Sequence, residues 1–459
     1  MASRTLEHAA RVMGGRVVAG DPAAAWEGGS LDSRRLHGGE LFFAIAGERR
    51  DGHEFVAAAL AAGAAGAVVH RDLPAPERGA LIRVDDTFAG LHALTRALRD
   101  ELPARLVAIT GSTGKTTTKE LLADLLSRRF RVARSPGNLN NLYGFPLSVM
   151  GMPEDTEWMV AEMGMNTPGE LSALSRLGRP EVAVFTNVRP VHLEGLGSLE
   201  AIADAKAELL EGVPADGMVV ANADDPRVRA IGERFPGRVV GFGHQAGDYR
   251  AVDVAPHAGR PGSRFRLLAP GGEEVAVELP LYGRYNVENF LAAAACAHAL
   301  GVPLDAIAAA AAEATSVAGR GVLHRLPAGT LLVDDSYNSN PVALTRALES
   351  AAELPGKRHW AVLGDMLELG REELRFHRQQ GEVAARLGFS PVAAVGELSR
   401  ALGEGAEAAG AEAHWFATAA EAAPWAATQL RPQDVVLVKA SRGVGLEAVV
   451  EALRREVEG

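Results

Sequence analysis

Cysteine is almost absent from this 459-residue chain, which contains only Cys296. A single cysteine excludes an intramolecular disulfide and is typical of a reducing compartment, so we expect a cytoplasmic protein. Cys296 lies in the alanine-rich run LAAAACAHAL, where a small buried core residue is expected rather than a nucleophile. The chain also lacks a membrane-length run of Leu, Ile, Val and Phe and a secretory core near its start. Neither membrane insertion nor export is therefore expected.

The chain also has fewer positive than negative residues, with 47 Lys and Arg, 58 Asp and Glu and a net charge of −11. This balance argues against nucleic acid as the main partner, since phosphate backbones require clustered Lys and Arg. A small nucleotide needs only a local positive field and stays compatible with it. Lysine is the scarcer base, and arginine supplies the ordinary surface cations. Each lysine is therefore a candidate for chemistry that guanidinium cannot perform, such as loss of a proton; the five are Lys115, Lys119, Lys206, Lys357 and Lys439.

Asparagine is scarce too, with ten in the chain. Ordinary turns can explain some of them. Chance is a weaker explanation for the way seven of the ten gather in three clusters, which are Asn138/Asn140/Asn141, Asn286/Asn289 and Asn338/Asn340.

The chain length predicts about three domains at roughly 150 residues each. Residues 1–103 mix short apolar runs (ELFFAIAG, AGAVVH, ALIRVDD) with alanine-rich helical stretches, which indicates a small N-terminal α/β domain. In residues 104–316, apolar runs such as WMVAEMG, VAVFTNV and MVVANADD are each followed by a helical pattern. This alternation predicts a central, doubly wound and mostly parallel sheet.

The end of the second segment changes character. Residues 249–281 alternate short strands with Gly/Pro turns, which predicts an antiparallel edge layer. Helices are expected near 286–300 and 303–314. Residues 317–459 again alternate strands (TLLVDDS, WAVLGDM, PVAAVG, VVLVKAS) with helices, so we expect a C-terminal Rossmann-like α/β domain without a glycine fingerprint. The predicted fold class is three-domain α/β.

Residues 107–122, VAITGSTGKTTTKELL, combine an apolar strand, a glycine-bracketed turn and the start of a helix. Backbone N–H groups of such a turn and the positive end of the helix form a cradle for phosphate. Lys115 can reach terminal phosphates, and the Thr116 hydroxyl can bind Mg²⁺. The glycine spacing is shorter than in the common G-x-x-x-x-G-K-[ST], because Gly111 and Gly114 lie three positions apart rather than five. The alternative interpretation is a glycine-rich turn from strand to helix that binds no ligand. The candidate ATP-binding residues of this loop are Gly111, Ser112, Thr113, Gly114, Lys115, Thr116 and Thr117.

Further candidates follow the next strands of the central segment. Glu162 ends a strand and is a natural Mg²⁺ ligand, although it can also be a helix cap or a solvated carboxylate. His192 lies in the loop after the following strand, where a structural or solvated histidine is the common case. Lys206 lies in ADAKAELL between Asp204 and Glu208, and the simpler interpretation is that it forms a surface salt bridge. Near two metal ions it can instead lose a proton and take up CO₂ as an anionic carbamate.

The remaining candidates lie towards the C-terminus. Asn286 and Asn289 are one helical turn apart and can read a nucleotide, or be an N-cap and a solvated side chain. Arg320 is a suitable phosphate clamp at the junction into the third segment. Asp334 and Asp335 end a strand, where carboxylates are commonly functional but also form turns. The strand-end residues that can hold the carboxylate of an incoming substrate are Lys439, Ser441 and Arg442.

Together these motifs resemble those of the Mur ligases, the ATP-dependent amide-forming enzymes of peptidoglycan precursor synthesis. TGSTGKTTTKE, EMG, VHLEG, DAKAE, RYNVEN and the GR hinge occur in that family's order, and the resemblance covers essentially the whole chain. LDSRRLHGGELFFAIAGERRDGHEF is similar to the UDP-binding first domain of the two later ligases. NLNNLYGFPLSV, DDSYNSNP, VLGDMLELG and VLVKASRG are most similar to the member that adds D-alanyl-D-alanine. The DNPR motif typical of the preceding ligase is absent.

The resemblance implies that ATP phosphorylates the terminal carboxylate of UDP-N-acetylmuramoyl-tripeptide and that the amine of D-Ala-D-Ala attacks the acyl phosphate. Lys115, Glu162, His192 and Lys206 would be catalytic. Two Mg²⁺ ions would be held by Thr116, Glu162, His192 and a carbamate formed on Lys206 from CO₂. It further implies ATP contacts from Asn286, Asn289, Arg320 and Asp335. The UDP substrate would meet Ser33, Arg34, Asn138, Asn140 and Asn141, and the dipeptide would approach along Tyr337, Asn338, Asn340, Lys439, Ser441 and Arg442.

Because ATP and the UDP substrate would bind different domains, a productive site requires domain closure, which also excludes water from the acyl phosphate. We expect a monomer. The nearest alternative is the preceding ligase, which adds diaminopimelate or lysine. Folylpolyglutamate synthetase is disfavoured by the first-segment motif, and a GTPase switch by the lack of any N-K dipeptide for an N-K-x-D motif. A scaffold that uses ATP only to order its domains is a further alternative.

Overall fold

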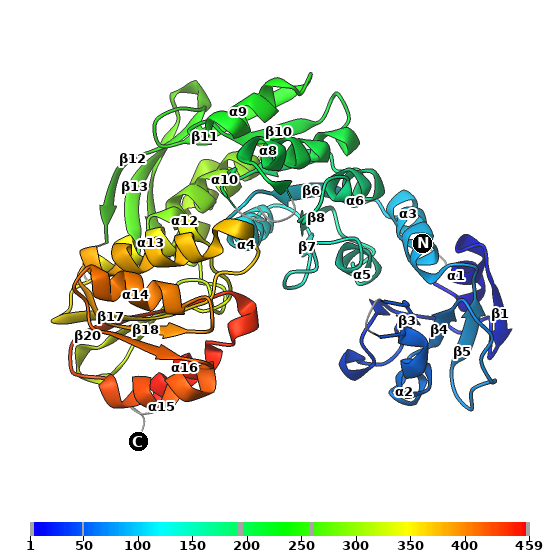
Figure 1. Ribbon diagram of the computed structural model, residues 1–459. Helices are drawn as coiled ribbons and strands as arrows, with labels where there is room; N and C mark the ends of the chain where they lie inside the picture. Colours follow the sequence, from blue (N-terminus) through cyan, green and yellow to red (C-terminus); the bar gives the residue numbers. More distant parts are fainter. Residues whose placement is uncertain (1–3, 48–49, 191–195, 258–260, 456–459) are drawn as a thin grey trace.

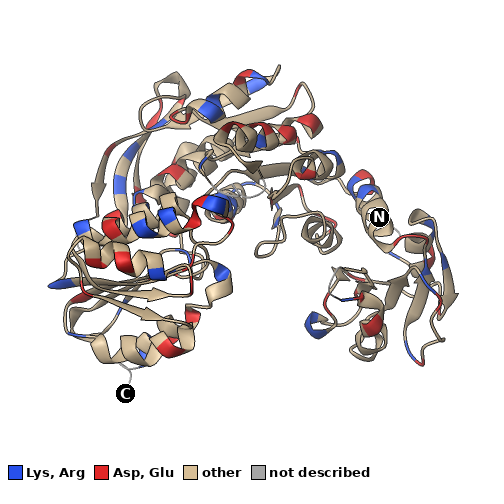
Figure 2. Ribbon diagram, in the orientation of Figure 1, with Lys and Arg blue, Asp and Glu red and all other residues tan. Residues whose placement is uncertain are grey.

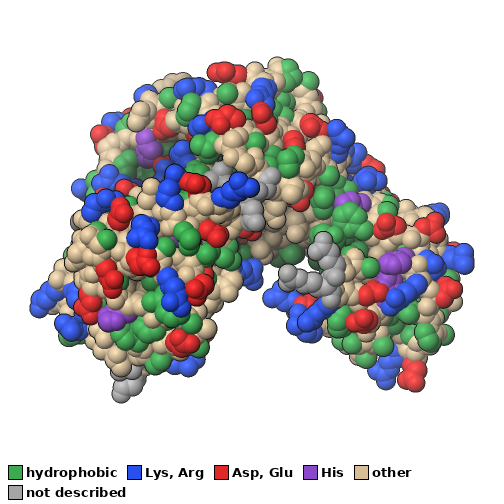
Figure 3. Space-filling view, viewed as in Figure 1, with side chains coloured by type: hydrophobic (Ala, Val, Ile, Leu, Met, Phe, Trp, Pro, Cys, Tyr) green, Lys and Arg blue, Asp and Glu red, His purple; other side chains and the backbone are tan. Residues whose placement is uncertain are grey.

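A computed structural model describes residues 4–47, 50–190, 196–257 and 261–455 of the chain. In the described residues the strands form three sheets, and each is built from one continuous stretch of sequence (Figure 1). The first and third sheets lie at opposite ends of the molecule, and the second spans the space between them. The space-filling view shows an open notch between the N-terminal lobe and the rest of the protein (Figure 3).

The first sheet has the strand order β1-β5-β4-β3-β2 and is parallel except for the pairing of β1 with β5. Its strands are short because Gly and Pro turns interrupt the apolar runs. The elements of this part are α1 (Leu6–Val12), β1 (Arg16–Ala19), β2 (Gly29–Ser30), β3 (Leu41–Phe43), α2 (Val56–Ala61), β4 (Gly66–Val69), β5 (Ala80–Arg83) and α3 (Thr87–Glu101).

The central sheet has nine strands in the order β14-β13-β12-β11-β10-β9-β6-β8-β7. Strands β6 to β12 pair in parallel, whereas β12, β13 and β14 form an antiparallel edge. Its strands are β6 (Arg105–Thr110), β7 (Val132–Arg134), β8 (Trp158–Glu162), β9 (Val182–Phe185), β10 (Met218–Asn222), β11 (Arg238–Gly243), β12 (Tyr249–Pro256), β13 (Ser263–Leu268) and β14 (Glu274–Leu279).

Helices cover both faces of this sheet, because its buried apolar side chains divide into two separate clusters on alternate positions of the strands. In β6, for example, Leu106 and Ala108 belong to one cluster and Val107 and Ile109 to the other. The helices are α4 (Lys115–Leu126), α5 (Gly144–Met150), α6 (Glu170–Gly178), α8 (Leu199–Ala207), α9 (Pro226–Glu233), α10 (Tyr285–Ala299) and α11 (Leu304–Ala312).

The third sheet has the order β15-β16-β20-β17-β18-β19, parallel except for β15, and also separates two apolar clusters. Its elements are β15 (Val322–Arg325), β16 (Leu331–Asp335), α12 (Pro341–Ala352), β17 (Arg358–Gly364), α13 (Glu373–Arg386), β18 (Phe389–Val395), α14 (Arg400–Ala408), β19 (Ala413–Phe416), α15 (Ala419–Gln429), β20 (Asp434–Lys439) and α16 (Glu447–Arg455).

Two elements connect the three parts. Helix α3 contacts α1 and β3 on one side and α5 and α6 of the central part on the other. Tyr282, in the loop before α10, is 4% exposed and inserts into the apolar cluster of the third sheet. The seams between the parts are therefore made by packing as well as by the connecting chain.

Lys and Arg are mixed with Asp and Glu along the outer helices, for example on α13 and α14 (Figure 2). Within the described residues, no helix has both the length and the apolar character needed to cross a bilayer.

The predicted three-part α/β fold is confirmed. The parallel central sheet, the antiparallel edge over 249–281, the helices near 286–300 and 303–314 and the Rossmann-like third sheet all occur. Cys296 is buried in α10, as expected of a core residue. The precise domain boundaries at 103/104 and 316/317 stay predictions. They fall in the connections between α3 and β6 and between α11 and β15.

Candidate active site

One cavity lies at the carboxyl ends of the central strands and is closed on its other side by the third part of the chain. This is where parallel α/β sheets commonly bind ligands. It brings together most of the candidates. From the central part come Gly111 to Thr117, Asn138, Asn140, Asn141, Glu162, Lys206 and Asn289, and from the junction and third part Arg320, Asp335, Tyr337, Asn338, Asn340 and Lys439.

The phosphate loop joins β6 to α4, and both of its glycines are required by their surroundings. Gly111 has a φ of +150°, and a Cβ there would lie 1.9 Å from the Thr186 hydroxyl. Gly114 has a φ of +83°, and a Cβ there would lie 2.1 Å from Oδ1 of Asn289. Side chains at these positions would strain the backbone and displace the two neighbouring residues. The loop is thus fitted closely between β9 and α10.

The loop uses some of its N–H groups internally. The Ser112 N–H donates to the carbonyl of Asn187 at 2.9 Å, and the Thr113 N–H donates to Asn187 Oδ1 at 3.0 Å. Among the described residues, none accepts from the N–H groups of Gly114, Lys115, Thr116 and Thr117. The groups available for an anion are therefore those at the start of α4, where the helix dipole adds to them.

Glu162, at the end of β8, is bonded to the start of α4 and to the segment that follows β7. Its Oε2 accepts from the Thr116 hydroxyl at 2.7 Å, and its Oε1 accepts from the Asn140 amide at 2.7 Å. Burial raises the pKa of this carboxyl, but Lys115, Thr116, Arg320 and Asn140 together hold it below its ordinary value. Glu162 is consequently a buried, ionised carboxylate beside a hydroxyl, which is an oxygen pair suited to Mg²⁺.

Lys115 and Lys206 face the cavity near each other. Lys115 Nζ donates to the carbonyl of Gly111 at 2.9 Å, so the side chain folds back over its own loop. Burial lowers the pKa of Lys115, Glu162 opposes the effect, and Arg320 adds to it. Burial and the charge of Lys115 hold the pKa of Lys206 well below its ordinary value. A neutral amine is thereby favoured at Lys206.

The salt-bridge interpretation of Lys206 does not hold for its two sequence neighbours. Asp204 pairs with Arg234 at 2.8 Å, and Glu208 accepts from the backbone N–H groups of Gly169 and Ser172. No described residue forms a hydrogen bond or ion pair with the Lys206 amine, which is 3% exposed in the cavity wall.

The opposite wall carries its own buried ion pair. Lys439 Nζ lies 2.5 Å from Asp335 Oδ2 and donates to the carbonyl of Asn338 at 2.8 Å. The two residues end the neighbouring strands β20 and β16, which places them side by side. Burial raises the pKa of Asp335, and the charges of Lys439 and Arg320 oppose that increase.

Tyr337 lies between two arginines at the mouth of this wall. The guanidinium of Arg320 is 4.1 Å from the centre of its ring, and that of Arg442 is 5.3 Å away. Arg442 also reaches the central part, where Nη1 lies 3.5 Å from Oδ1 of Asn138. Such stacking holds a guanidinium in place while its N–H groups stay available.

Some candidates do not line the cavity. The Asn286 amide donates to the carbonyl of Tyr282 at 2.7 Å, and Asn286 Oδ1 accepts from Asn289 at 3.0 Å, so Asn286 supports Asn289. The Ser441 hydroxyl accepts from the N–H of Leu367 at 3.0 Å. Ser33 and Arg34 lie in the first part, in the 3₁₀ turn Ser33–Arg35, and Arg34 pairs there with Asp32 at 2.8 Å. His192 lies outside the described residues.

Asn138, Asn140 and Asn141 line the central cavity, whereas Ser33 and Arg34 do not. Asn140 acts there on Glu162, as described above. Their place is thus beside the phosphate loop, and the first part contributes no described residue to the cavity wall.

The sequence reasoning missed three further asparagines and one ion pair. Asn166 and Asn187 line the cavity, and the Asn222 amide donates to the carbonyl of Thr186 at 2.9 Å. The scarcity of asparagine was the signal that could have identified them, because eight of the ten asparagines line this one cavity. Glu288 and Arg346 also line it and pair at 3.1 Å across the seam between α10 and α12. No motif in the sequence marked them.

Three family profiles match successive parts of the sequence. They are described as the Mur ligase family catalytic domain over residues 27–97, the Mur ligase middle domain over 109–297 and the Mur ligase glutamate ligase domain over 319–442. The UDP-N-acetylmuramoyl-tripeptide--D-alanyl-D-alanine ligase of Escherichia coli K12 is 38% identical, with 99% of both chains covered. The chain belongs to the Mur ligase family. The correspondingly named Bacillus subtilis Mur ligase is 36% identical over 93% of both chains.

Solved Mur ligase structures agree with this membership. A MurF crystal structure from Acinetobacter baumannii is 31% identical in sequence and has a TM-score of 0.87. The match covers 98% of this chain and 98% of that one. The Thermotoga maritima MurF ligase in complex with ADP is 30% identical with a TM-score of 0.82, covering 94% of this chain and 98% of that one. The resemblance to Mur ligases found in the sequence is thereby confirmed.

Proposed function

We propose that this Mur ligase joins D-alanyl-D-alanine to UDP-N-acetylmuramoyl-tripeptide with the hydrolysis of ATP to ADP and phosphate. The observation that carries the proposal is one cavity in which a phosphate loop, a buried carboxylate and a desolvated lysine face a second wall of paired charges. Relatives named for this reaction cover nearly the whole chain at 36–38% identity. We further propose that it acts as a cytoplasmic monomer.

ATP would bind with its phosphates on the open N–H groups at the start of α4. The contacts assigned to its other parts are Asn289, supported by Asn286, and Arg320 and Asp335 from the third part. In the described residues no three His, Cys, Asp or Glu side chains cluster as a metal site. Thr116 and Glu162 nevertheless fit Mg²⁺, since it takes oxygen ligands and keeps several waters and phosphates. Bound there, Mg²⁺ would neutralise phosphate charge.

In the reaction, an oxygen of the tripeptide carboxylate attacks the γ-phosphorus and ADP leaves. Lys115 would leave the Gly111 carbonyl and stabilise the charge on the transferring phosphoryl group. The amine of D-Ala-D-Ala then attacks the acyl carbon, and phosphate is expelled as the amide forms. Domain closure would keep water from the acyl phosphate.

Lys206 would contribute as a carbamate. Its neutral amine attacks CO₂, an N–C bond forms and one proton is released to solvent, which leaves an anionic oxygen donor. The lowered pKa of Lys206 and the lack of a described partner support this role. Together with His192, it would hold the second Mg²⁺ ion.

The remaining candidates are assigned to the two substrates. Ser33 and Arg34 would hold the UDP part in the first domain, while Asn138, Asn140 and Asn141 would meet the substrate nearer the phosphate loop. The dipeptide would approach the wall formed by Tyr337, Asn338, Asn340, Lys439 and Arg442, with Ser441 supporting its backbone.

An assay of ATP-dependent phosphate release tests the proposal. UDP-N-acetylmuramoyl-tripeptide is supplied with D-Ala-D-Ala, and both it and the corresponding UDP-dipeptide are supplied with free diaminopimelate or with free lysine. We expect release only when both the UDP substrate and D-Ala-D-Ala are present. Release with a free amino acid on the UDP-dipeptide, and indifference to D-Ala-D-Ala, would support the preceding ligase. Release without either substrate would contradict ligation altogether.

A further inference from the structure

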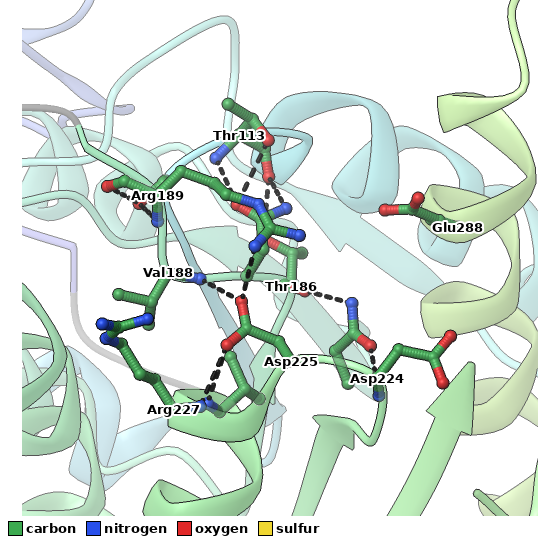
Figure 4. Close-up of polar contacts among 12 residues, drawn as sticks. Thr113, Thr186, Val188, Arg189, Asp224, Asp225, Arg227 and Glu288 are labelled. Atoms are coloured by element: carbon green, nitrogen blue, oxygen red, sulfur yellow. Dashed lines mark hydrogen bonds and ion pairs between the residues drawn. The ribbon is translucent and has the colours of Figure 1, made fainter. Parts of the chain in front are cut away.

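Asp225, which follows β10, is a buried carboxylate with four donors around it. Oδ1 accepts from the N–H groups of Arg227 at 3.0 Å and Val228 at 3.4 Å, which caps the start of α9. Oδ2 accepts from the N–H of Val188 at 2.9 Å and lies 3.4 Å from Nη1 of Arg189. One oxygen thus serves its own helix, while the other reaches across to the segment after β9 (Figure 4).

The segment that Asp225 reaches, residues 186–189, is interlocked with the phosphate loop. The Thr186 hydroxyl donates to the carbonyl of Thr113 at 2.8 Å, and Asn187 Oδ1 accepts from the N–H and the hydroxyl of Thr113. The Ser112 hydroxyl donates to the carbonyl of Arg189 at 3.0 Å and accepts from its N–H at 2.8 Å. A shift of this segment would therefore move the loop.

We propose that Asp225 is a positioning residue for ATP. Its second oxygen holds residues 186–189 against the phosphate loop and so fixes the N–H groups that bind phosphate. This inference rests on the proposed function only where turnover is measured, because nucleotide binding can be measured without an acceptor substrate.

Two substitutions separate bridging from capping. Asp225→Ser keeps an oxygen that can cap α9, since serine is among the preferred N-cap residues, but it is too short to reach Val188. Asp225→Asn also keeps a capping oxygen and replaces the second one by an N–H₂ group, which faces the donors of Val188 and Arg189. Both variants should retain the helix and lose the bridge.

Asp224 offers a matched control. It also accepts backbone N–H groups, from His244 at 2.6 Å and Ala246 at 3.0 Å, but these belong to the turn after β11. In the described part of the chain, no hydrogen bond or ion pair joins the Asp224 carboxylate to residues 186–189. Figure 4 shows its carboxylate directed away from Asp225 and Val188. Asp224→Asn therefore makes the same chemical change one residue away without touching residues 186–189.

The test measures ADP–Mg²⁺ binding by calorimetry, steady-state kinetics and thermal unfolding of the full chain. For Asp225→Asn and Asp225→Ser we expect Kd for ADP and KM for ATP to rise about tenfold, kcat to fall about tenfold to a hundredfold, and KM for D-Ala-D-Ala to stay unchanged. Asp224→Asn should match the parent in every kinetic constant.

A purely structural role would lower the unfolding temperature of the Asp225 variants and leave Kd and KM at parental values well below that temperature. That result would overturn the inference, as would equal losses in the Asp224→Asn variant. A parent that binds ADP but does not ligate D-Ala-D-Ala would instead contradict the proposed function, and the ADP measurements would still decide the role of Asp225.

Discussion

Two buried lysines face the same cavity from opposite walls, but their electrostatic surroundings differ. Lys206, in the last turn of α8, has no partner among the described residues, and burial together with Lys115 lowers its pKa strongly. Lys439, at the end of β20, is equally buried but lies 2.5 Å from the Asp335 carboxylate and also bonds the carbonyl of Asn338. Both are 3% exposed.

The comparison shows that burial alone does not decide what a lysine does. Desolvation without a counter-charge favours the neutral form of an amine, whereas a carboxylate close to a buried amine favours its charged form. The central wall thus holds a desolvated amine, which we propose reacts with CO₂. The third wall holds Lys439 in a close pair with Asp335, and we propose that this pair shapes the approach of a substrate.

Exchange of each lysine for arginine should give the largest difference. Lys206→Arg places a guanidinium at this position that cannot form a carbamate, so kcat should fall by about a hundredfold to a thousandfold or more. Lys439→Arg can still pair with Asp335 and should lose about tenfold at most. Phosphate release under saturating substrates measures both, and added short-chain carboxylate should partly rescue Lys206→Ala. Equal losses in the two arginine variants would remove the contrast.

Removal of the counter-charge should make Lys439 resemble Lys206. Asp335→Asn leaves a buried ammonium without its carboxylate, which should cost about 3 kcal/mol in the free energy of unfolding. Denaturant titration of the variant checks this value. The matched change Asp334→Asn, at the half-buried neighbour whose carboxylate accepts from Ser336, should cost much less. A parental stability for Asp335→Asn would mean that Lys439 does not depend on its pair.

The lowered pKa of Lys206 also predicts a pH dependence of stability. The folded-state pKa lies below the ordinary value of 10.5, so unfolding takes up a proton at every pH between the two values. Stability should therefore rise with pH across this interval, by up to about 1.4 kcal/mol per pH unit from this residue. In CO₂-depleted buffer, Lys206→Met should remove that contribution and be more stable than the parent at neutral pH. Parallel pH profiles for parent and variant would contradict the desolvated amine.

The smallest effect is expected at the exposed lysine. Lys357 precedes β17 at the surface, away from the cavity. Lys357→Arg should change neither turnover nor stability by more than about 0.5 kcal/mol. Thermal unfolding and the ligation assay measure both, and a larger change would show that the scarcity of lysine carries information even at the surface.

The sequence predicted the sheets and most of the cavity because strand–helix alternation and strand-end polar residues are local patterns. The sequence could not predict the contact between Asn140 and Glu162, because the two residues meet only when β7 and β8 pair. The same holds for Glu288 and Arg346, whose pairing depends on how the third part sits against α10. Lysine scarcity identified Lys115, Lys206 and Lys439. It does not distinguish them from Lys119, whose buried ammonium donates to the carbonyls of Ser135 and Gly137 and stabilises that loop.

The most direct test of the two-lysine account is carbonyl NMR of the protein equilibrated with ¹³C-bicarbonate. The account predicts a carbamate resonance in the parent that persists in Lys439→Arg and disappears in Lys206→Arg. A parent without the resonance, or a resonance that survives in Lys206→Arg, would contradict it.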